Sequence, residues 1–322
     1  MQEPTYQDVL DARERIRPYL PPTPFHEIPP LSEKFGCRFF LKFESMQPTG
    51  AFKVRGGVNL VSQLPPEERE RGLITASTGN HGGSIAWAAR AFGVRATVAA
   101  PEGSNPDKLT AIRRMGAEVV LAGKDFDEAR EWCEVKADER GLRYIHSANE
   151  PRLIAGVATA VLECLEEAAD LDVLIVPIGG GSGAAGAGLA AKTMNPRIHL
   201  VGVQAENAPA VHQSLRAGRM LPYPSSATFA DGLATRVPFE LTFGMMQRLV
   251  DETLLVAEKE MCEAIRLLVS DVGVIAEGAG AAPTAAAAKM DLRGKKVAAI
   301  LSGRNLTAEN LRIILSGGVP RP

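Results

Sequence analysis

Length, composition and charge exclude several classes of protein. The 322 residues are 45% hydrophobic and carry 36 basic and 38 acidic side chains, a net charge of −2, so we expect two domains with a sizeable core and no basic surface for nucleic acid. The charged N-terminus lacks the apolar segment of a signal peptide, and the uncharged run 174–191 contains Pro177 and six glycines, so we expect a cytoplasmic protein that does not enter a membrane.

The first segment that suggests chemistry follows a strand-like run, RFFLKFES (38–45). In MQPTGAFKVRGG (46–57), Lys53 stands among small and apolar residues. A lone lysine is usually a solvated surface group. In apolar surroundings its ammonium is destabilised and its pKa falls, which is what a lysine needs to act as a Schiff-base nucleophile.

Two later segments share a plan of strand, glycine-bearing turn, helix and strand. The first comprises GLITAS (72–77), TGNHGG (78–83), SIAWAARAFG (84–93) and VRATVAA (94–100). The second comprises VLIVPI (173–178), GGGSG (179–183), AAGAGLAAKTM (184–194) and IHLVGVQ (198–204). A third unit begins with a helix at Asn105-Pro106 and leads into AEVVLA (117–122). These βαβ units predict an α/β fold with two open, mostly parallel sheets flanked by helices, and the lack of a linker predicts interleaved domains.

Three other segments predict helices whose role is packing. Residues 125–140 form a charged pattern typical of a solvated helix, and 259–271 has an apolar stripe of Met261, Ile265, Leu268 and Val269. The alanine-rich segment 277–290 indicates a tightly packed helix rather than a disordered tract.

The glycine-rich turn at 179–183 predicts an anion site. Between a strand and a helix, such a turn directs backbone N–H groups and the helix dipole at one small volume where a phosphate binds, and the Ser182 hydroxyl adds a donor. A rival interpretation uses the same loop: residues 181–186 fit GxGxxG, and Glu206 stands where the ribose-binding acid of a nicotinamide dinucleotide site would lie.

Two more motifs lie at predicted strand ends. In STGNHG (77–82), exposed N–H groups at a helix start suit a substrate carboxylate, and Asn80 offers an amide; the alternative for Ser77 and Thr78 is simple N-capping. In LSGRN (301–305), the strand KKVAAIL ends at the hydroxyl of Ser302, and ligands gather at the carboxyl ends of parallel strands. The dinucleotide interpretation leaves Lys53 and both of these motifs unexplained.

Taken in order, these motifs resemble a known family. AFKVRGG, ASTGNHGG, PIGGGSGAAG, FADG (229–232), AEGAGAA (276–282) and LSGRN are similar to the pyridoxal-phosphate enzymes of fold type II, in the branch of threonine and serine dehydratases and serine racemase. The resemblance runs from about Tyr6 to Leu315. The STGNHG and SGRN variants look most like the hydroxyectoine-utilisation dehydratases of that branch. The resemblance implies a tryptophan synthase β-like fold, with a large cofactor-binding domain of residues 1–48 plus 150–322 and a smaller substrate-side domain of 49–149, its core about 72–149.

The resemblance also assigns site residues by position. Lys53 matches the lysine that holds pyridoxal 5′-phosphate as a Schiff base and later takes the substrate α-proton. Ser302 matches the partner of the pyridine nitrogen, and Asn80 the contact of the ring hydroxyl. The other implied cofactor contacts are Phe52, Gly179, Gly180, Gly181, Ser182, Gly183, Gly232 and Glu277. The implied substrate-binding residues are Ser77, Thr78, Gly79, Asn80 and His81, and of these Ser77 and Thr78 join Lys53 as predicted catalytic residues.

The predicted reaction is α,β-elimination from a β-hydroxy amino acid of threonine or serine type. A serine hydroxyl, unlike an aspartate, does not force protonation of the ring nitrogen, so prompt loss of the β-hydroxyl is favoured over a long-lived carbanion. The alternative is an amino-acid racemase, an epimerase or a β-replacement enzyme, because Thr78 replaces the alanine of many dehydratases and resembles the hydroxyl of serine racemase. A nicotinamide-dependent oxidoreductase is the remote alternative.

Metals, cysteines and assembly complete the expectations. The positions that match the family's divalent-metal acids are Gln204 and Ala210, which supply few oxygen ligands, and Glu206 is off position, so no metal is predicted. The cysteines, Cys37, Cys133, Cys164 and Cys262, lack metal spacing and predict buried, reduced thiols. Tyr223, Phe229 and Phe239 are expected to be core aromatics, and the alternative is that they lie near the pocket for the substrate side chain. The resemblance suggests a homodimer that acts on a small amino acid, with no regulatory domain after LSGRN.

Overall fold

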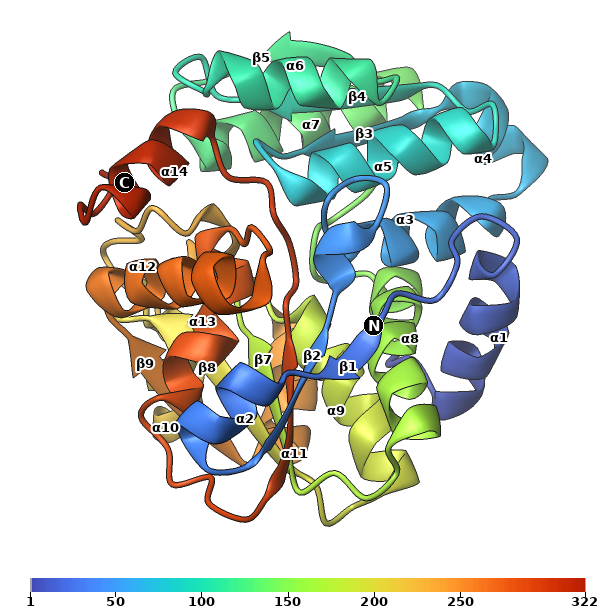
Figure 1. The fold of residues 1–322 in the computed structure, drawn as a ribbon. Helices are drawn as coiled ribbons and strands as arrows, with labels where there is room; N and C mark the ends of the chain where they lie inside the picture. The colour runs from blue at the N-terminus through green and yellow to red at the C-terminus, as the bar shows by residue number, and fades with distance from the viewer. Residues whose placement is uncertain (1, 322) are drawn as a thin grey trace.

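Two β-sheets organise the chain, and each has helices on its faces (Figure 1). The computed structural model describes residues 2–321, apart from the side chain of Asp127. The larger sheet has the order β1 (Phe25–Glu27), β2 (Arg38–Lys42), β10 (Lys296–Ile300), β7 (Val173–Pro177), β8 (His199–Ala205) and β9 (Glu252–Val256). The smaller sheet has the order β5 (Glu118–Leu121), β4 (Ala96–Ala100), β3 (Leu73–Ala76) and β6 (Arg143–Tyr144).

The pairing confirms the predicted α/β class with mostly parallel sheets. Only the β1–β2 pair is antiparallel among the pairs of the described strands. The central strands are buried almost throughout, as LITA in β3 and VLIVP in β7 are, which is the pattern of parallel strands covered on both faces. The chain leaves the larger sheet after β2, builds the smaller one and returns with β7, so the two units are interleaved. The domain boundaries at 48/49 and 149/150 stay a prediction.

Helices fill the connections between strands. In chain order they are α1 (Tyr6–Ile16), α2 (Pro29–Phe35), α3 (Lys53–Ser62), α4 (Pro66–Arg71), α5 (Asn80–Ala91), α6 (Pro106–Arg114), α7 (Phe126–Arg140), α8 (Pro151–Glu167), α9 (Ser182–Met194), α10 (Ala210–Ala217), α11 (Glu240–Leu249), α12 (Glu258–Leu267), α13 (Gly278–Ala287) and α14 (Ala308–Leu315). Short turns of other helical types are η1 (Glu44–Met46), η2 (Asp231–Leu233) and η3 (Leu268–Val272). No helix of residues 2–321 has the length and apolar character needed to cross a bilayer.

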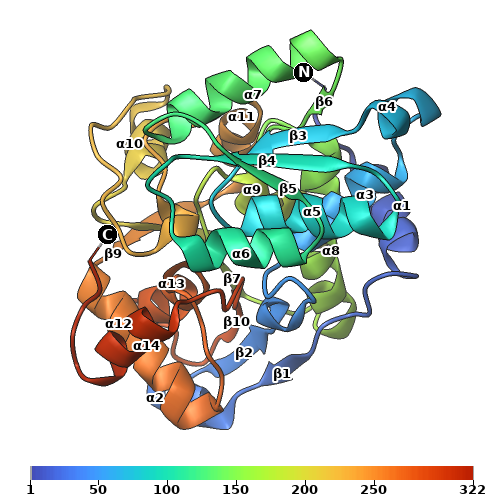
Figure 2. The same cartoon turned by 90° about the horizontal axis from the view of Figure 1, so that it is seen from above.

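Opposite faces of the smaller sheet contact different helices. Leu73 packs in one apolar cluster with Ile85 of α5 and Ile112 of α6, whereas its neighbour Ile74 packs in another with Cys133 of α7. Figure 2 shows the corresponding layers, with α7 on one side of β3 and β4 and α5 and α6 on the other. The alternation follows from the two-residue period of a strand. It also corrects the prediction for α7, which is not fully solvated because Ala129, Cys133 and Ala137 are buried.

Helix α3 joins the two units. It packs against α5 and α8, and its contact with α8 is so close that a Cβ at Gly156 would lie 2.7 Å from the Arg55 carbonyl oxygen. The segment was not predicted as a helix, because Gly56 and Gly57 in its middle weaken the local preference. Tertiary packing rather than local preference therefore stabilises this helix, whose first residue is Lys53.

Several predicted boundaries move by a few residues. The turn predicted over 78–83 is helical from Asn80, and the turn over 179–183 is helical from Ser182. The helix predicted over 259–271 ends at Leu267 and continues as the π-type turn η3. All four cysteines are buried and free, as predicted. Among the residues that the structure describes, no group of three or more His, Cys, Asp or Glu side chains could hold a metal ion.

Candidate active site

A cavity of about 620 Å³ lies between the two sheets, at the carboxyl ends of their strands. Three of its walls are formed by motifs found in the sequence, each directly after a strand. STGNHG follows β3, GGGSG follows β7 and LSGRN follows β10. The structure places every predicted site residue in the lining: Phe52, Lys53, Ser77, Thr78, Gly79, Asn80, His81, Gly179, Gly180, Gly181, Ser182, Gly183, Gly232, Glu277 and Ser302. Segments far apart in the chain therefore contribute to a single site, while the individual roles stay predictions.

Lys53 is directed at the glycine-rich loop. Its Nζ donates a hydrogen bond to Ser182 Oγ at 2.7 Å and lies 3.3 Å from the carbonyl oxygen of Ser147. Burial in the cavity wall lowers the pKa of this amine to about 8, in agreement with the argument from its apolar neighbours. An amine with that pKa is available as a nucleophile and as a base close to neutral pH.

The rate at which Lys53 reacts with an amine reagent is expected to rise steeply through pH 8. Only the deprotonated amine is nucleophilic, and with a pKa of about 8 its fraction grows about fivefold from pH 7 to 8 and little above 9. Labelling with trinitrobenzenesulfonate, resolved by peptide mass mapping, would measure the profile after hydroxylamine has freed the amine from any bound aldehyde. Lys259, whose side chain is 79% exposed, is the internal comparison, and identical profiles for the two lysines would contradict the expectation.

Two histidines near Lys53 are held neutral. Burial, followed by the charge of Lys53, lowers the pKa of His81 to about 3, and burial, followed by Arg130, lowers that of His146 to about 4. The Thr75 hydroxyl donates to the Ile145 carbonyl at 2.7 Å, so its oxygen accepts from His81 Nε2–H at 2.9 Å. His81 therefore keeps Nδ1 unprotonated and adds no positive charge to the cavity.

The loop 179–183 fits a phosphate group. Among the hydrogen bonds of residues 2–321, none uses a backbone N–H of these loop residues as donor, although they surround the start of α9 and line the cavity. The Thr242 hydroxyl holds the loop by donating to the Gly180 carbonyl at 2.8 Å. A Cβ at Gly179 would overlap the carbonyl oxygen of Gly232, so this approach requires glycine. Unbonded N–H groups at a helix start attract a phosphate.

Polar side chains bridge the cavity from one sheet to the other. Asn80 donates to Glu277 Oε1 at 2.7 Å and accepts from Asn305 Nδ2 at 2.7 Å. Lys108, on α6, forms an ion pair with Asp231, on η2. Burial raises the pKa of Glu277, although the hydrogen bond from Asn80 opposes this. Lys108, Asp231 and Asn305 were not predicted as site residues. Asp231 belongs to the motif FADG and Asn305 to LSGRN, whereas Lys108 belongs to no motif.

Ser302 offers an uncommitted hydroxyl to the cavity. It lies just beyond β10, is 3% exposed, and its carbonyl oxygen accepts from Phe52 N at 2.9 Å. In the part of the chain that the structure describes, its Oγ makes no hydrogen bond to protein. The hydroxyl is thus free to meet a ring nitrogen, as the resemblance implies.

Ser77 serves a structural purpose. Its Oγ accepts from Gly79 N at 3.1 Å and from Gly82 N at 2.9 Å, at the start of α5, whose N-cap position is Gly79. These bonds favour a structural role for Ser77, and its part in catalysis stays a prediction. The Thr78 hydroxyl lines the cavity and makes no hydrogen bond to any other described residue.

Of the three aromatic residues and Glu206, two line the cavity and two do not. Phe229 and Phe239 line the cavity, so for these two residues the alternative position near the pocket is the one that the structure shows. Both lie in the long connection between α10 and α11, whose path local sequence does not reveal. Neither Tyr223 nor Glu206 is among the described residues that line the cavity. The dinucleotide interpretation thereby loses the acid on which it depended.

Comparison with known proteins agrees with this geometry. The sequence pattern of the family described as pyridoxal-phosphate dependent enzyme matches residues 16–303. An L-threonine ammonia-lyase of Thermotoga maritima is 40% identical over 98% of this chain and 79% of its own length. The processed form of tomato (Solanum lycopersicum) threonine deaminase isoform 2 superposes with a TM-score of 0.92 at 31% identity, covering 97% of this chain and 92% of that one. Maize serine racemase superposes equally, with a TM-score of 0.92, 29% identity and 98% of both chains covered.

Proposed function

This chain belongs to the family of pyridoxal-phosphate dependent enzymes, and from that premise we propose that it is an ammonia-lyase that converts a β-hydroxy amino acid of threonine or serine type into a 2-oxo acid and ammonia. One observation carries the proposal: a lysine amine of lowered pKa lies 2.7 Å from a glycine-rich loop whose N–H groups make no hydrogen bond to another described residue. The relatives named for threonine ammonia-lyase and threonine deaminase support the choice of substrate.

The residues of the cavity divide the work between binding and proton transfer. The N–H groups of residues 179–183 would hold the phosphate, and the Ser302 hydroxyl and the Asn80 amide would hold the ring. Bound there, pyridoxal phosphate would supply an aldehyde that bonds to amines and a ring that withdraws electrons from the substrate α-carbon. Lys53 Nζ would hold the aldehyde carbon and would accept the α-proton of the substrate.

The atoms of the proposed reaction balance without an oxidant or reductant. The substrate loses its α-proton and its β-hydroxyl, which leave together as water. One water is taken up again when the carbon–nitrogen bond is hydrolysed, so the net products are a 2-oxo acid and ammonia. The neutral His81 and His146 add no positive charge beside Lys53, so it is burial that lowers the pKa of its amine.

An absorbance spectrum of the purified protein tests this proposal first. We expect a visible band, a pyridoxyl adduct on the Lys53 peptide after borohydride reduction, and oxo-acid release from threonine or serine. A colourless protein that takes up no pyridoxal phosphate would overturn the proposal. An adduct at Lys53 without release of oxo acid from any β-hydroxy amino acid would overturn the lyase assignment alone.

Thr78 favours one second activity, racemisation. A hydroxyl on the opposite side of the substrate from Lys53 would return a proton to the other face of the α-carbon, and the Thr78 hydroxyl lines the cavity free of protein partners among the described residues. We expect Thr78→Ala to abolish any D-amino acid product while keeping elimination within about tenfold of wild type. Chiral chromatography beside an oxo-acid assay measures the ratio, and an unchanged ratio would refute the role of Thr78.

We also propose that the enzyme works in the cytoplasm as a homodimer and binds neither nucleic acid nor membrane. The near-neutral charge balance supports the exclusion of nucleic acid. The resemblance to the dehydratase branch supports the dimer. Light scattering of the purified chain would give its mass in solution, and a monomer at every concentration would exclude the dimer.

A further inference from the structure

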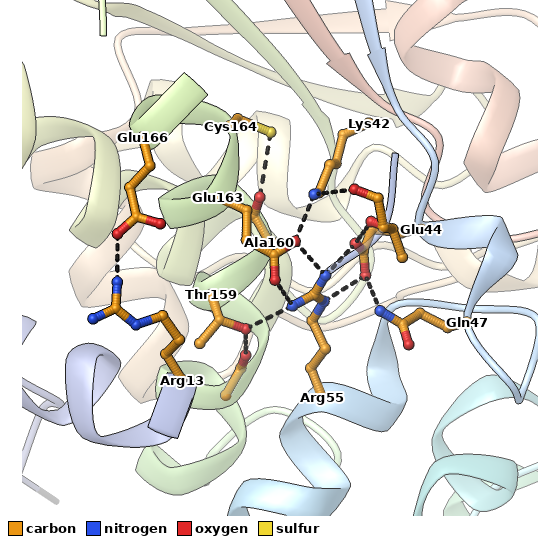
Figure 3. Close-up of polar contacts among 12 residues, drawn as sticks. Arg13, Lys42, Glu44, Gln47, Arg55, Thr159, Ala160, Glu163, Cys164 and Glu166 are labelled. Carbon is orange, nitrogen blue, oxygen red and sulfur yellow. Dashed lines mark hydrogen bonds and ion pairs between the residues drawn. The ribbon is translucent and has the colours of Figure 1, made fainter. Parts of the chain in front are cut away.

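Arg55, near the cavity, has a buried side chain whose hydrogen-bond donors are all used. It is 0% exposed, and its guanidinium makes five hydrogen bonds, two to Glu44, two to Glu163 and one to Thr159, at 2.6 to 3.1 Å. A guanidinium has five N–H donors, so every donor is used. Figure 3 shows the guanidinium between the two carboxylates, each of which binds it through both oxygens.

A second cation closes this network. Lys42, on β2, donates to Glu163 at 2.5 Å and to the Thr23 carbonyl at 2.8 Å, and the Thr23 hydroxyl donates to Glu44 at 2.5 Å. Two cations therefore face two carboxylates. Burial alone would raise the pKa of Glu44, but the charge and hydrogen bonds of Arg55 lower it below its ordinary value, so the carboxylate is ionised.

A network of this kind is a poor source of stability. Desolvation of four charged groups offsets much of their attraction, and apolar residues of similar size are often as stabilising. What the network does provide is a fixed geometry, because two bidentate pairs hold a planar guanidinium from two directions. The groups come from β2, η1, α3 and α8, so the network fixes the position of α3 relative to the larger sheet.

Arg55 stands two residues after Lys53 on α3. Side chains two positions apart in a helix point about 200° apart around its axis. Arg55 therefore faces α8 while Lys53 faces the cavity. The N-terminus of α3 has no side-chain cap, and the Lys53 carbonyl accepts from the Ser84 hydroxyl of α5 at 2.7 Å. The bonds that fix Arg55 on one side of the first turn therefore also fix where the Lys53 side chain, on the other side, enters the cavity.

We infer that Arg55, held between Glu44 and Glu163, is a positioning residue that sets where the Lys53 amine enters the cavity. The inference rests on the proposed function, in which that amine is the reacting group. It assigns the buried charges to alignment of the helix, and it explains why a fully bonded arginine lies directly behind the lysine.

The test measures Lys53 itself in three variants. Arg55→Lys keeps the charge but has too few donors for two bidentate pairs, and Glu163→Gln weakens one pair. The double variant Arg55→Met with Glu163→Met removes one charge of each sign, so the network stays neutral. It serves as the test if a single variant fails to fold. After hydroxylamine has removed bound pyridoxal phosphate from each protein, we expect labelling of Lys53 by added pyridoxal phosphate and borohydride, and by trinitrobenzenesulfonate, to slow about tenfold or more. We also expect the pH midpoint of labelling to rise as the amine becomes more exposed to water.

Glu166→Gln is the matched control. Glu166 lies one turn along α8 from Glu163, pairs with Arg13 at the surface and is 44% exposed (Figure 3). This variant is expected to label like wild type. A folded network variant whose Lys53 labels at the wild-type rate and midpoint would overturn the inference. If wild-type Lys53 reacts with trinitrobenzenesulfonate but not with pyridoxal phosphate, the proposed function fails, and the shift seen with the first reagent still decides the role of Arg55.

Discussion

Lys53→Ala is expected to reduce oxo-acid production by at least about 10³-fold. The substitution removes both the amine that binds the aldehyde and the base that accepts the α-proton, and loss of a general base alone costs about 10²- to 10⁴-fold. The alanine variant should still fold, because within residues 2–321 the Lys53 side chain donates hydrogen bonds to no more than two groups, the Ser182 hydroxyl and the Ser147 carbonyl. Steady-state assays and the visible spectrum, each compared with thermal unfolding, measure the effect.

Rescue and control sharpen this result. Added primary amines of small size are expected to restore part of the proton transfer, since the alanine leaves space for them. Lys259→Ala removes an exposed lysine and should leave the rate unchanged. A Lys53→Ala enzyme that keeps more than about a tenth of the wild-type rate would show that another group is the base.

Gly179→Ala is expected to abolish retention of pyridoxal phosphate. The new methyl group would overlap the Gly232 carbonyl, a backbone atom that cannot turn aside, so the loop must shift and its N–H groups lose their common direction. Strain of this kind costs at least about 2 kcal/mol. Equilibrium dialysis should show affinity for the cofactor falling by about 30-fold or more.

Gly103→Ala is the matched control for the loop. A Cβ at Gly103 meets no atom within 4 Å, so both stability and cofactor affinity are expected to match wild type. If Gly179→Ala binds pyridoxal phosphate as tightly as Gly103→Ala does, the loop is not the phosphate site.

The sequence predicted the site better than the contacts around it. Lys53, the glycine loop, STGNHG and Ser302 were identifiable because each stands in a local motif at a strand end, and the structure brings all of them to one cavity. The helix α3 was not predicted, because its two central glycines have a low helix propensity. Packing against α5 and α8 stabilises it instead, and local sequence does not reveal that packing. The pairs Lys108–Asp231 and Arg55–Glu163 join residues more than 100 positions apart, and no motif marks which distant partner each would meet.

The closed balance of charges around Arg55 limits how this part of the protein can change over generations. Losing any one member leaves a buried charge without its counterpart, whereas losing one cation and one carboxylate together leaves the balance intact. Substitutions at other core positions can accumulate one at a time. In this network a cation and a carboxylate have to be replaced together. Lys42, Glu44, Arg55 and Glu163 should therefore be inherited as a set, and a descendant that has replaced Arg55 should have replaced a carboxylate as well.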